Sequence, residues 1–268
     1  YHLTKLLPPS VYVEGEADLY SVFKDPPIQN RPYVRWWWNG DKVERDELSR
    51  ELRLLQRAGI GGVEINPVKF PARTDDLGKK SLVWLSPEWI EMLNFTLDEA
   101  KSLGMTCDLI VGSGWPFGAE WLEGDERSQA VVVGTKKLEG PADYEVSLFD
   151  LFKEADPTIS SPFPGRTMEM LSIYLAPAIT NDLNDVTDLS NKVLNGTLRC
   201  KIPQGKFVLY ALVRISSFMQ VIQGAPGATG PVLNHYNKQA VEKYLDKMSN
   251  AIRGSIGPLS SRVRCFFS

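Results

Sequence analysis

Histidine and cysteine are scarce in this chain of 268 residues. The two histidines are His2 and His235, and the three cysteines, Cys107, Cys200 and Cys265, lie far apart. Neither a CxxC pair nor a Cys/His cluster occurs, which argues against structural zinc and against a disulfide-stapled scaffold. A catalytic triad would have to use His235, and no GxSxG turn accompanies it, so Ser-His-Asp hydrolysis is disfavoured.

Long apolar runs and clustered basic residues are also lacking. The apolar stretches fall far short of the roughly 20 residues that span a membrane, so no membrane span is expected, and no signal peptide is visible. A net charge of −3 without a basic run argues against binding to nucleic acid. The absence of GxGxxG and P-loop patterns after the expected strands disfavours a nucleotide site. What remains is the ordinary composition of a globular protein, with 43% hydrophobic and 24% charged residues.

The first part of the chain alternates strand and helix patterns. Residues 1–30 contain several prolines and read as an extended arm. The expected elements are then a strand at 33–38, a helix between Asp41 and Gly59 opened by Asp41-x-x-Glu44, a strand at 60–65, a helix from Ser86 to Gly104, and a strand at 105–111. Short links between apolar strands indicate right-handed βαβ units and a parallel sheet. A β/α barrel of the TIM type is the first expectation, and a doubly wound sheet is the second.

The middle of the chain changes character. Residues 128–222 are rich in β formers and turn residues, with Asn195-Gly196 and Gln204-Gly205 as turn signals. We therefore expect an antiparallel β module inserted in the barrel series. A helix capped by Asn237 and a strand at 262–267 resume that series. The predicted organisation is an arm at 1–30, barrel units at 31–127, the inserted module at 128–222, and a return to the barrel at 223–268, truncated at Ser268.

Three consecutive tryptophans, Trp36 to Trp38, precede Asn39-Gly40. Successive strand residues point to opposite faces, so the three rings cannot all enter one core. A hydrophobic cluster at the end of a strand is one reading, and a ring that faces a sugar is the other. Barrel enzymes place their active sites at the carboxyl ends of the strands. On that basis Trp38 and Asn39 are expected on the site side, with one or both of the other rings in the core.

The ends of the other expected strands supply further candidates, each with a structural alternative. Glu64 is either a functional carboxylate or a paired charge, and Asn66 follows it at the strand end. Asp108 is expected to form a buried hydrogen bond or salt bridge. The remaining candidates are Ser113 and Trp115 in a glycine-rich loop, which could be only a tight turn, and His235, for which a structural donor is the more usual role.

Five segments in this order resemble the N-terminal part of glycoside hydrolase family 106, the α-L-rhamnosidases. They read RPYVRWWWNG, AGIGGVEI, LSPEW, LGMTCDLIVGSGWPFG and GPVLNHYNKQAVEKYL. The resemblance implies a barrel with β insertions, an inverting hydrolase, and calcium that helps to hold the rhamnose hydroxyls. Inversion needs an acid and a base carboxylate roughly 6.5–9.5 Å apart.

The resemblance also suggests roles for individual residues. Arg35, Trp38 and Trp115 become sugar-contacting candidates, Asn39 a calcium or hydroxyl ligand, and Glu64 a catalytic carboxylate. Asn66, Ser113 and His235 complete the expected substrate-binding set. The main catalytic carboxylates are expected beyond Ser268. Asn234 departs from the family, where Asp is usual.

The sequence therefore supports a leading hypothesis and an alternative. The first is a bacterial glycosidase, periplasmic or secreted, that removes terminal rhamnose from oligo- or polysaccharides, with the isolated chain inactive. The second is a carbohydrate-binding module without catalysis, which would use the same Trp, Arg and Asn surface.

Overall fold

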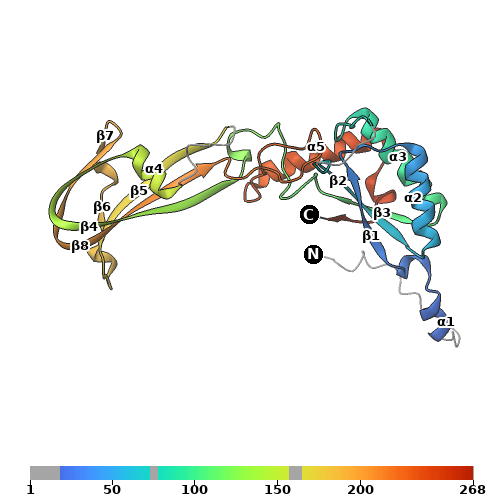
Figure 1. Ribbon diagram of the computed structural model, residues 1–268, viewed down its shortest axis with the longest axis horizontal. Coiled ribbons are helices and arrows are strands. Elements are labelled where there is room, and N and C mark those ends of the chain that lie inside the picture. The colour runs from blue at the N-terminus through green and yellow to red at the C-terminus, as the bar shows by residue number, and fades with distance from the viewer. Residues whose placement is uncertain (1–18, 73–77, 157–164, 268) are drawn as a thin grey trace.

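The computed structural model describes residues 19–72, 78–156 and 165–267. These residues form an elongated molecule in which a parallel sheet with helices lies at one end and an antiparallel arm extends from it (Figure 1). A mixed α/β fold with both kinds of sheet was predicted from the sequence and is confirmed.

The parallel sheet has four strands, in the order β1-β2-β3-β9. They are β1 (Tyr33–Asn39), β2 (Gly62–Val68), β3 (Thr106–Ile110) and the short β9 (Phe266–Phe267). Every pair is parallel, and the register aligns Arg35 with Glu64 and Glu64 with Asp108. The second strand runs beyond its predicted end to Val68, so Asn66 lies within it and not in the loop that follows.

Five α-helices and several 3-10 turns accompany the two sheets in the described residues. They are α1 (Leu19–Lys24), α2 (Arg45–Arg57), α3 (Pro87–Ser102) and α5 (Lys238–Ile256), with α4 in the arm and 3-10 turns at Ile28–Asn30, Gly124–Glu126, Leu183–Asp185, Ser190–Lys192 and Leu259–Ser261. The Ser86 and Asn237 side chains cap α3 and α5 by accepting backbone N–H bonds, as predicted. The predicted start of α2 is wrong, because Asp41 is buried away from that helix end and Glu44 makes no side-chain cap bond.

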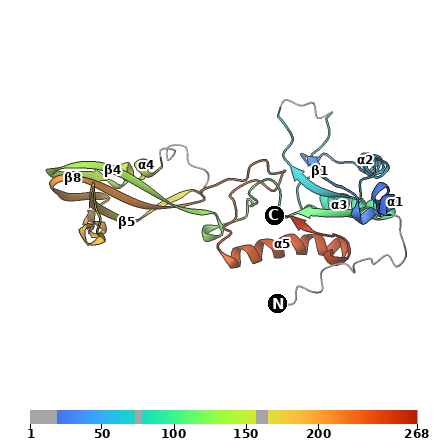
Figure 2. The same cartoon turned by 90° about the horizontal axis from the view of Figure 1, so that it is seen from below.

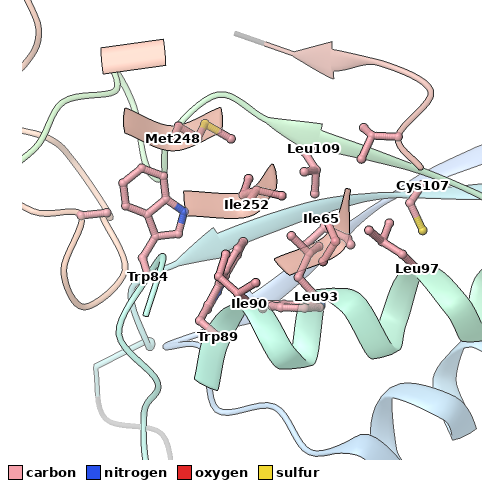
Figure 3. Close-up of a cluster of buried hydrophobic side chains, with 14 of the residues drawn as sticks. Ile65, Trp84, Trp89, Ile90, Leu93, Leu97, Cys107, Leu109, Met248 and Ile252 are labelled. Carbon is pink, nitrogen blue, oxygen red and sulfur yellow. The ribbon is translucent and has the colours of Figure 1, made fainter. Parts of the chain in front are cut away.

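Helices α2, α3 and α5 all pack on one face of the parallel sheet. Alternate strand residues on that face, among them Trp38, Ile65 and Leu109, join Leu93 of α3 and Ile252 of α5 in one buried cluster (Figure 3). Burying such side chains contributes roughly 1.5–3 kcal/mol each. The opposite face of these strands carries none of the three helices.

This one-sided arrangement bears on the choice between the two expected topologies. A doubly wound sheet has helices on both faces, whereas a barrel wall has strands in sequential order with its helices outside. The described strands follow the second pattern, and in the described part of the chain they form an open sheet. Closure into a TIM-type barrel stays a prediction.

The antiparallel arm is built from long strands. They are β4 (Gln129–Ser147), β5 (Thr167–Pro177), β6 (Thr187–Asp188), β7 (Val193–Leu194) and β8 (Thr197–Ser216), with β8 paired to both β4 and β5. Asn195-Gly196 forms the predicted tight turn, with both residues at positive φ. Gln204-Gly205 does not end the strand: β8 continues through it with Gly205 at positive φ, and the register shift with β4 falls between Gly140 and Ala142.

Helix α4 (Leu148–Ala155) covers one face of the arm and completes a second apolar cluster around Leu151, Ile173 and Leu209. The arm thus has a core separate from that of the parallel sheet. Figures 1 and 2 show the arm extending away from the parallel sheet and its helices. Within the described residues, no helix combines the length and the apolar character that crossing a membrane requires.

Candidate functional site

The face of the parallel sheet opposite the helices is polar and aromatic. On β1, Arg35, Trp37 and Asn39 are exposed while Trp36 and Trp38 between them are buried. Side chains alternate along a strand, so the first three share the open face. On β2, the register places Glu64 beside Arg35 and Asn66 beside Trp37. The carboxyl ends of β1 and β2 therefore bring an aromatic ring, a guanidinium, a carboxylate and two amides together.

Trp115 reaches the same place from the loop after β3. Its ring centroid lies 6.4 Å from that of Trp37, and the Arg35 guanidinium carbon lies 5.9 Å from the Trp115 centroid. Trp37 and Trp115 are 53% and 39% exposed, which leaves much of both rings available to a ligand. Paired backbone bonds between Trp115 and Ile222 anchor the loop. Gly114 lies at positive φ with a backbone oxygen so close that a side chain there would collide with it.

A groove of about 470 Å³ lies against these rings. That volume is within the range of small-ligand sites, about 300–1,000 Å³. It is lined by Trp37, Asn39, Val68, Lys69, Phe70, Pro71, Ala72, Trp115 and Gln223. Apolar walls with amides at the rim suit a ligand that has both apolar and hydroxylated surfaces.

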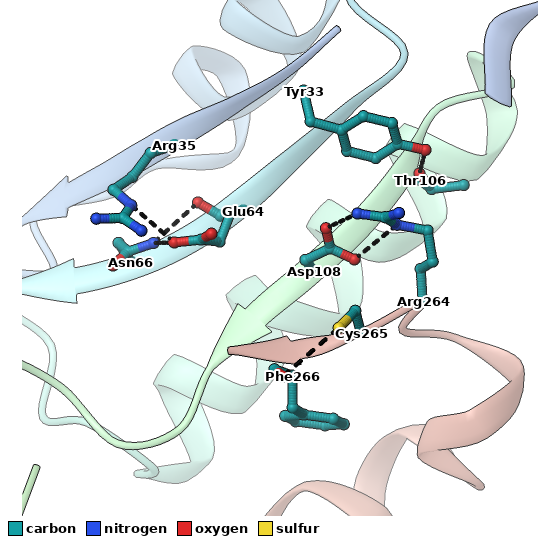
Figure 4. Close-up of polar contacts among 9 residues, drawn as sticks. All are labelled: Tyr33, Arg35, Glu64, Asn66, Thr106, Asp108, Arg264, Cys265 and Phe266. Carbon is teal, nitrogen blue, oxygen red and sulfur yellow. Dashed lines mark hydrogen bonds and ion pairs between the residues drawn. The ribbon is translucent and has the colours of Figure 1, made fainter. Parts of the chain in front are cut away.

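Glu64 is the best-held carboxylate of this face. Its Oε1 accepts a bond from Arg35 Nε at 2.8 Å and another from Asn66 Nδ2 (Figure 4). Glu64 is 8% exposed and Asn66 is fully buried. The amide oxygen of Asn66 has no hydrogen-bond partner among the described residues. A buried unpaired acceptor is costly. Like Ser113, however, Asn66 is fully buried and does not line the groove, so it presents no surface to a ligand.

The amino-terminal part of the same face is occupied by structural contacts. Arg264 donates to both oxygens of Asp108, and Thr106 donates to the Tyr33 hydroxyl at 2.6 Å (Figure 4). The Arg264 guanidinium also lies 4.1 Å from the centre of the Tyr33 ring. Asp108 is 1% exposed. The interpretation of Asp108 as a buried ion-pair residue is therefore confirmed.

Asp41 carries an unusual charge state. It is fully buried and has a positive φ just after Gly40. Burial raises the pKa of its carboxyl to about 8, and the neighbouring Trp89 indole opposes this rise only weakly. Asp41 does not line the groove.

Three predicted site residues lie elsewhere. Trp38 is 1% exposed and packs edge-on against Trp36 and Trp89, so the expectation that it faces the site is wrong. Ser113 is fully buried, where its hydroxyl donates to the Pro67 carbonyl and accepts from the Ala225 N–H. It thus fixes the loop that carries Trp115 and has no surface for a substrate. His235 is exposed, and its ring packs against Phe117 outside the groove.

The structure also adds residues that the sequence reasoning missed. Trp37, Lys69 and Gln223 line the groove. Trp37 could have been identified, because Arg35 and Asn39 were expected at the site and Trp37 has the same strand parity. No local signal marks Lys69 or Gln223, since their position depends on two loops meeting.

The described residues do not by themselves fit a calcium ion. They contain no group of three or more His, Cys, Asp or Glu side chains suited to a metal. Calcium takes about six to eight oxygen ligands, whereas Asn39 offers one amide oxygen at the groove. No step of the chemistry below is assigned to a metal.

Comparisons with known proteins found glycosidases at the level of family, sequence and fold. The family described as alpha-L-rhamnosidase, glycoside hydrolase family 106, matches residues 24–159. A protein from Formosa agariphila named "Putative beta-glucuronidase" is 22% identical and aligns with 91% of this chain and 23% of its own length. The structure of a rhamnosidase from Novosphingobium sp. PP1Y superposes with a TM-score of 0.59 at 15% identity, covering 91% of this chain and 38% of that one.

These similarities differ in what they establish. At 15% identity, the solved structure shows a shared fold. The chain spans less than two fifths of either relative's length. The family match covers half of the chain and includes β1, β2, β3 and the loop that bears Trp115. The chain therefore belongs to glycoside hydrolase family 106.

Proposed function

We propose that this chain supplies the sugar-binding wall of an α-L-rhamnosidase that acts on rhamnose-containing oligo- or polysaccharides. One observation carries the proposal: Trp37, Trp115, Arg35 and Glu64 converge at the carboxyl ends of parallel strands. Active sites of β/α barrels lie at that edge. We further propose that the four strands belong to a closed TIM-type barrel.

The contacts suggest how a sugar would bind. Its apolar C–H face would lie against the exposed rings of Trp37 and Trp115, which bury area at little cost in conformational entropy. Its hydroxyls would meet the Glu64 carboxylate, the Arg35 guanidinium and the Asn39 amide. Rings and polar groups at one edge thus match a molecule with one apolar and one hydroxylated surface.

Hydrolysis would require more than this wall provides. An inverting enzyme uses two carboxyl groups, one as acid and one as base, with water between them. On the described polar face, Glu64 and Asp108 are neighbours in register, but Arg264 holds both oxygens of Asp108. We therefore assign Glu64 to the sugar site as the candidate catalytic carboxylate of this chain. The remaining acid–base machinery is proposed to lie in a longer protein, and the isolated chain is expected not to cleave aryl rhamnosides.

Two further proposals accompany this function. Large glycans are met outside the cell membrane, so we propose a periplasmic or secreted bacterial location. Calcium is proposed to help hold the rhamnose hydroxyls, with Asn39 as the ligand from this chain. The other calcium ligands would have to come from outside the described residues.

Calorimetric titration of the chain with L-rhamnose, with and without calcium, tests the proposal. Trp37→Ala and Trp115→Ala should each weaken binding about five- to twelvefold, because each ring offers about 1–1.5 kcal/mol of stacking and burial. Phe149→Ala is the matched control, since Phe149 is a 61% exposed aromatic on the arm. Unchanged binding by both tryptophan variants would refute the aromatic site.

A non-catalytic carbohydrate-binding module is the second candidate. The observation that favours it is that Arg264 holds both oxygens of Asp108, which leaves Glu64, itself only 8% exposed, beside the described aromatic rings. Assay of the natural-length protein from its source on an aryl rhamnoside separates the two. Turnover by that protein supports the enzyme, whereas binding without turnover supports the module.

A further inference from the structure

We propose that Asn195 is a site of spontaneous covalent modification, at which the side-chain amide is converted to aspartate and isoaspartate. The attacking group is the backbone nitrogen of Gly196, and the co-reactant is water. This inference concerns the tip of the antiparallel arm and is independent of the proposed sugar site.

The chain contains two Asn-Gly pairs, Asn39-Gly40 and Asn195-Gly196. Glycine favours this reaction because it carries no side chain beside the backbone nitrogen that must attack. Both asparagines are exposed, and both glycines have positive φ. The two dipeptides alone would therefore react alike, and a difference between them has to come from the surrounding structure.

The backbone nitrogen of Gly40 is held in place. Its N–H donates to the Val68 carbonyl at 2.6 Å, and a Cβ added to Gly40 would lie 2.7 Å from the Cβ of Phe70. Gly40 is buried, and Asn39 ends a seven-residue strand in register with Val68. Attack on the Asn39 amide would have to break this hydrogen bond and rotate the peptide in a crowded place. The fold therefore protects the asparagine of the groove.

The backbone nitrogen of Gly196 is not held in this way. In the described part of the chain its N–H donates no backbone hydrogen bond, and a Cβ added to Gly196 would have no atom within 4 Å. The preceding strand β7 has two residues, which pair with β8 as Val193 with Leu198 and Leu194 with Thr197. β7 lies at the end of the arm far from the parallel sheet (Figure 1). Such a short terminal hairpin opens locally at a low free-energy cost.

The reaction balances with one water molecule. The Gly196 nitrogen loses its proton and bonds to the side-chain carbon Cγ of Asn195, and the bond from Cγ to Nδ2 breaks. The leaving nitrogen takes up a proton and departs as ammonia, so that a five-membered succinimide remains. Water then opens the ring. Attack at Cγ gives aspartate, whereas attack at the main-chain carbonyl carbon gives isoaspartate, in which the backbone continues through the former side chain.

Isoaspartate would disturb the start of α4. The Gly196 carbonyl accepts a hydrogen bond from the Leu148 N–H at 2.8 Å, where α4 begins. A two-residue turn with positive φ at both positions does not accommodate an additional backbone carbon. The product should therefore lose this bond, and the Leu148 amide proton should exchange faster with solvent. The parallel sheet has a separate core and should be unaffected.

Peptide mapping after prolonged incubation tests the inference, because trypsin separates the two pairs. It releases residues 193–199 with Asn195 and residues 36–42 with Asn39. In water enriched in oxygen-18 the new carboxyl group carries the label, which distinguishes the reaction from earlier damage. Mass spectrometry then follows the labelled fraction of each peptide. In the native protein Asn195 should react at least about tenfold faster than Asn39, a ratio equivalent to about 1.4 kcal/mol, which is of the order of one hydrogen bond.

The same chain unfolded in guanidinium chloride is the internal control. Without the fold, both peptides should acquire the label at similar rates. Asn195→Gly is the matched variant, because glycine accepts positive φ and carries no amide. Circular dichroism verifies that the variant is folded. After the same incubation it should retain the slow Leu148 exchange that the wild-type protein loses.

Each outcome decides one part of the inference. Labelling of native Asn195 no faster than that of Asn39 overturns the assignment of the site. A rate ratio that is as large in denaturant as in the native protein overturns the protection assigned to the Gly40 hydrogen bond. Leu148 exchange that stays slow after Asn195 is fully converted overturns the link to α4. A tenfold native ratio that disappears on unfolding supports the site and its structural cause together.

Discussion

The two faces of the parallel sheet use the same strands for opposite purposes. On the helix-covered face, Trp36 and Trp38 are buried, and Trp38 packs against Trp89 of α3. On the open face, Trp37 is half exposed beside Trp115. Of three consecutive tryptophans, two thus pack in the core and one is exposed on the open face. Strand parity, rather than residue type, decides which ring can contact a ligand.

Two carboxyl groups, Asp41 after β1 and Glu64 on β2, show the same contrast between a buried and an open face. Asp41 is fully buried, and burial raises its pKa to about 8. Glu64 is held on the open face by Arg35 and Asn66. A buried acid without a cation is stabilised in its neutral form. The comparison indicates that the open face keeps an Arg35–Glu64 ion pair beside its exposed rings, whereas the buried Asp41 carboxyl has no cation partner among the described residues.

Removal of single tryptophans gives the largest test of this contrast. Trp38→Ala should lower the free energy of unfolding by about 3–5 kcal/mol, because it deletes a large ring from a packed core. Trp37→Ala should cost less than about 1 kcal/mol, because its ring is half exposed. Urea unfolding followed by circular dichroism measures both. Equal losses would mean that the two faces are energetically alike.

Asp41→Asn tests the contrast between the carboxylates. The folded-state pKa of about 8 exceeds the unfolded value of about 3.9, so the native state holds the proton more tightly. The stability from this group is present below about pH 4 and is lost as pH rises toward 8. Asparagine cannot ionise and tolerates the positive φ. Between pH 4 and 8 the variant should gain roughly 2–5 kcal/mol relative to wild type.

Unfolding midpoints at several pH values measure this gain. Asp185→Asn, which changes an exposed acid on the arm, should leave the pH profile of wild type unchanged. A profile for Asp41→Asn that runs parallel to wild type would show that Asp41 ionises normally in the native state.

Local patterns predicted the strands and helices of the parallel sheet well. Ser86 and Asn237 correctly predicted the starts of α3 and α5, because capping depends only on neighbouring residues. The turn predicted at Gln204-Gly205 is wrong, because long-range pairing with β4 continues β8 through a dipeptide that favours turns. The helix start predicted at Asp41 is wrong for a similar reason. Asp41 is buried near Trp89 of α3, and no local pattern encodes that contact.

The candidate site was predictable in part. Arg35, Asn39, Glu64, Asn66 and Trp115 lie at the carboxyl ends of strands or in the loop that follows, where barrel logic placed them. Trp38 was assigned to the site together with Arg35, although the two residues are three positions apart on one strand and therefore point to opposite faces. Ser113 looked like a polar loop residue, and only the structure shows the backbone groups of Pro67 and Ala225 that occupy its hydroxyl. Groove residues from two loops could not be paired without coordinates.

Asp108→Asn tests whether the amino-terminal part of the open face is structural, in contrast to the aromatic site at the carboxyl ends of the strands. Arg264 donates to both Asp108 oxygens, so a neutral amide should cost about 1–3 kcal/mol and leave a guanidinium poorly paired. The backbone bonds that join β3 to β9 should also exchange their protons faster. Urea unfolding and hydrogen exchange measure these effects. Glu145→Gln is the control, because its pair with Arg199 is exposed and should contribute less than about 1 kcal/mol. A loss no larger than that of the control would contradict a structural role for Asp108.

The smallest expected stability effect, and the most informative for function, belongs to Glu64→Gln. Half of the Arg35 side chain is exposed, so loss of this pair should change stability by less than about 1 kcal/mol. Glutamine keeps the shape but accepts hydroxyl donors more weakly than a carboxylate, so rhamnose affinity should fall about three- to tenfold. Parallel calorimetry and urea unfolding separate the two roles. If stability falls while sugar affinity stays unchanged, Glu64 is a structural partner of Arg35, and the open face binds sugar through its rings and amides alone.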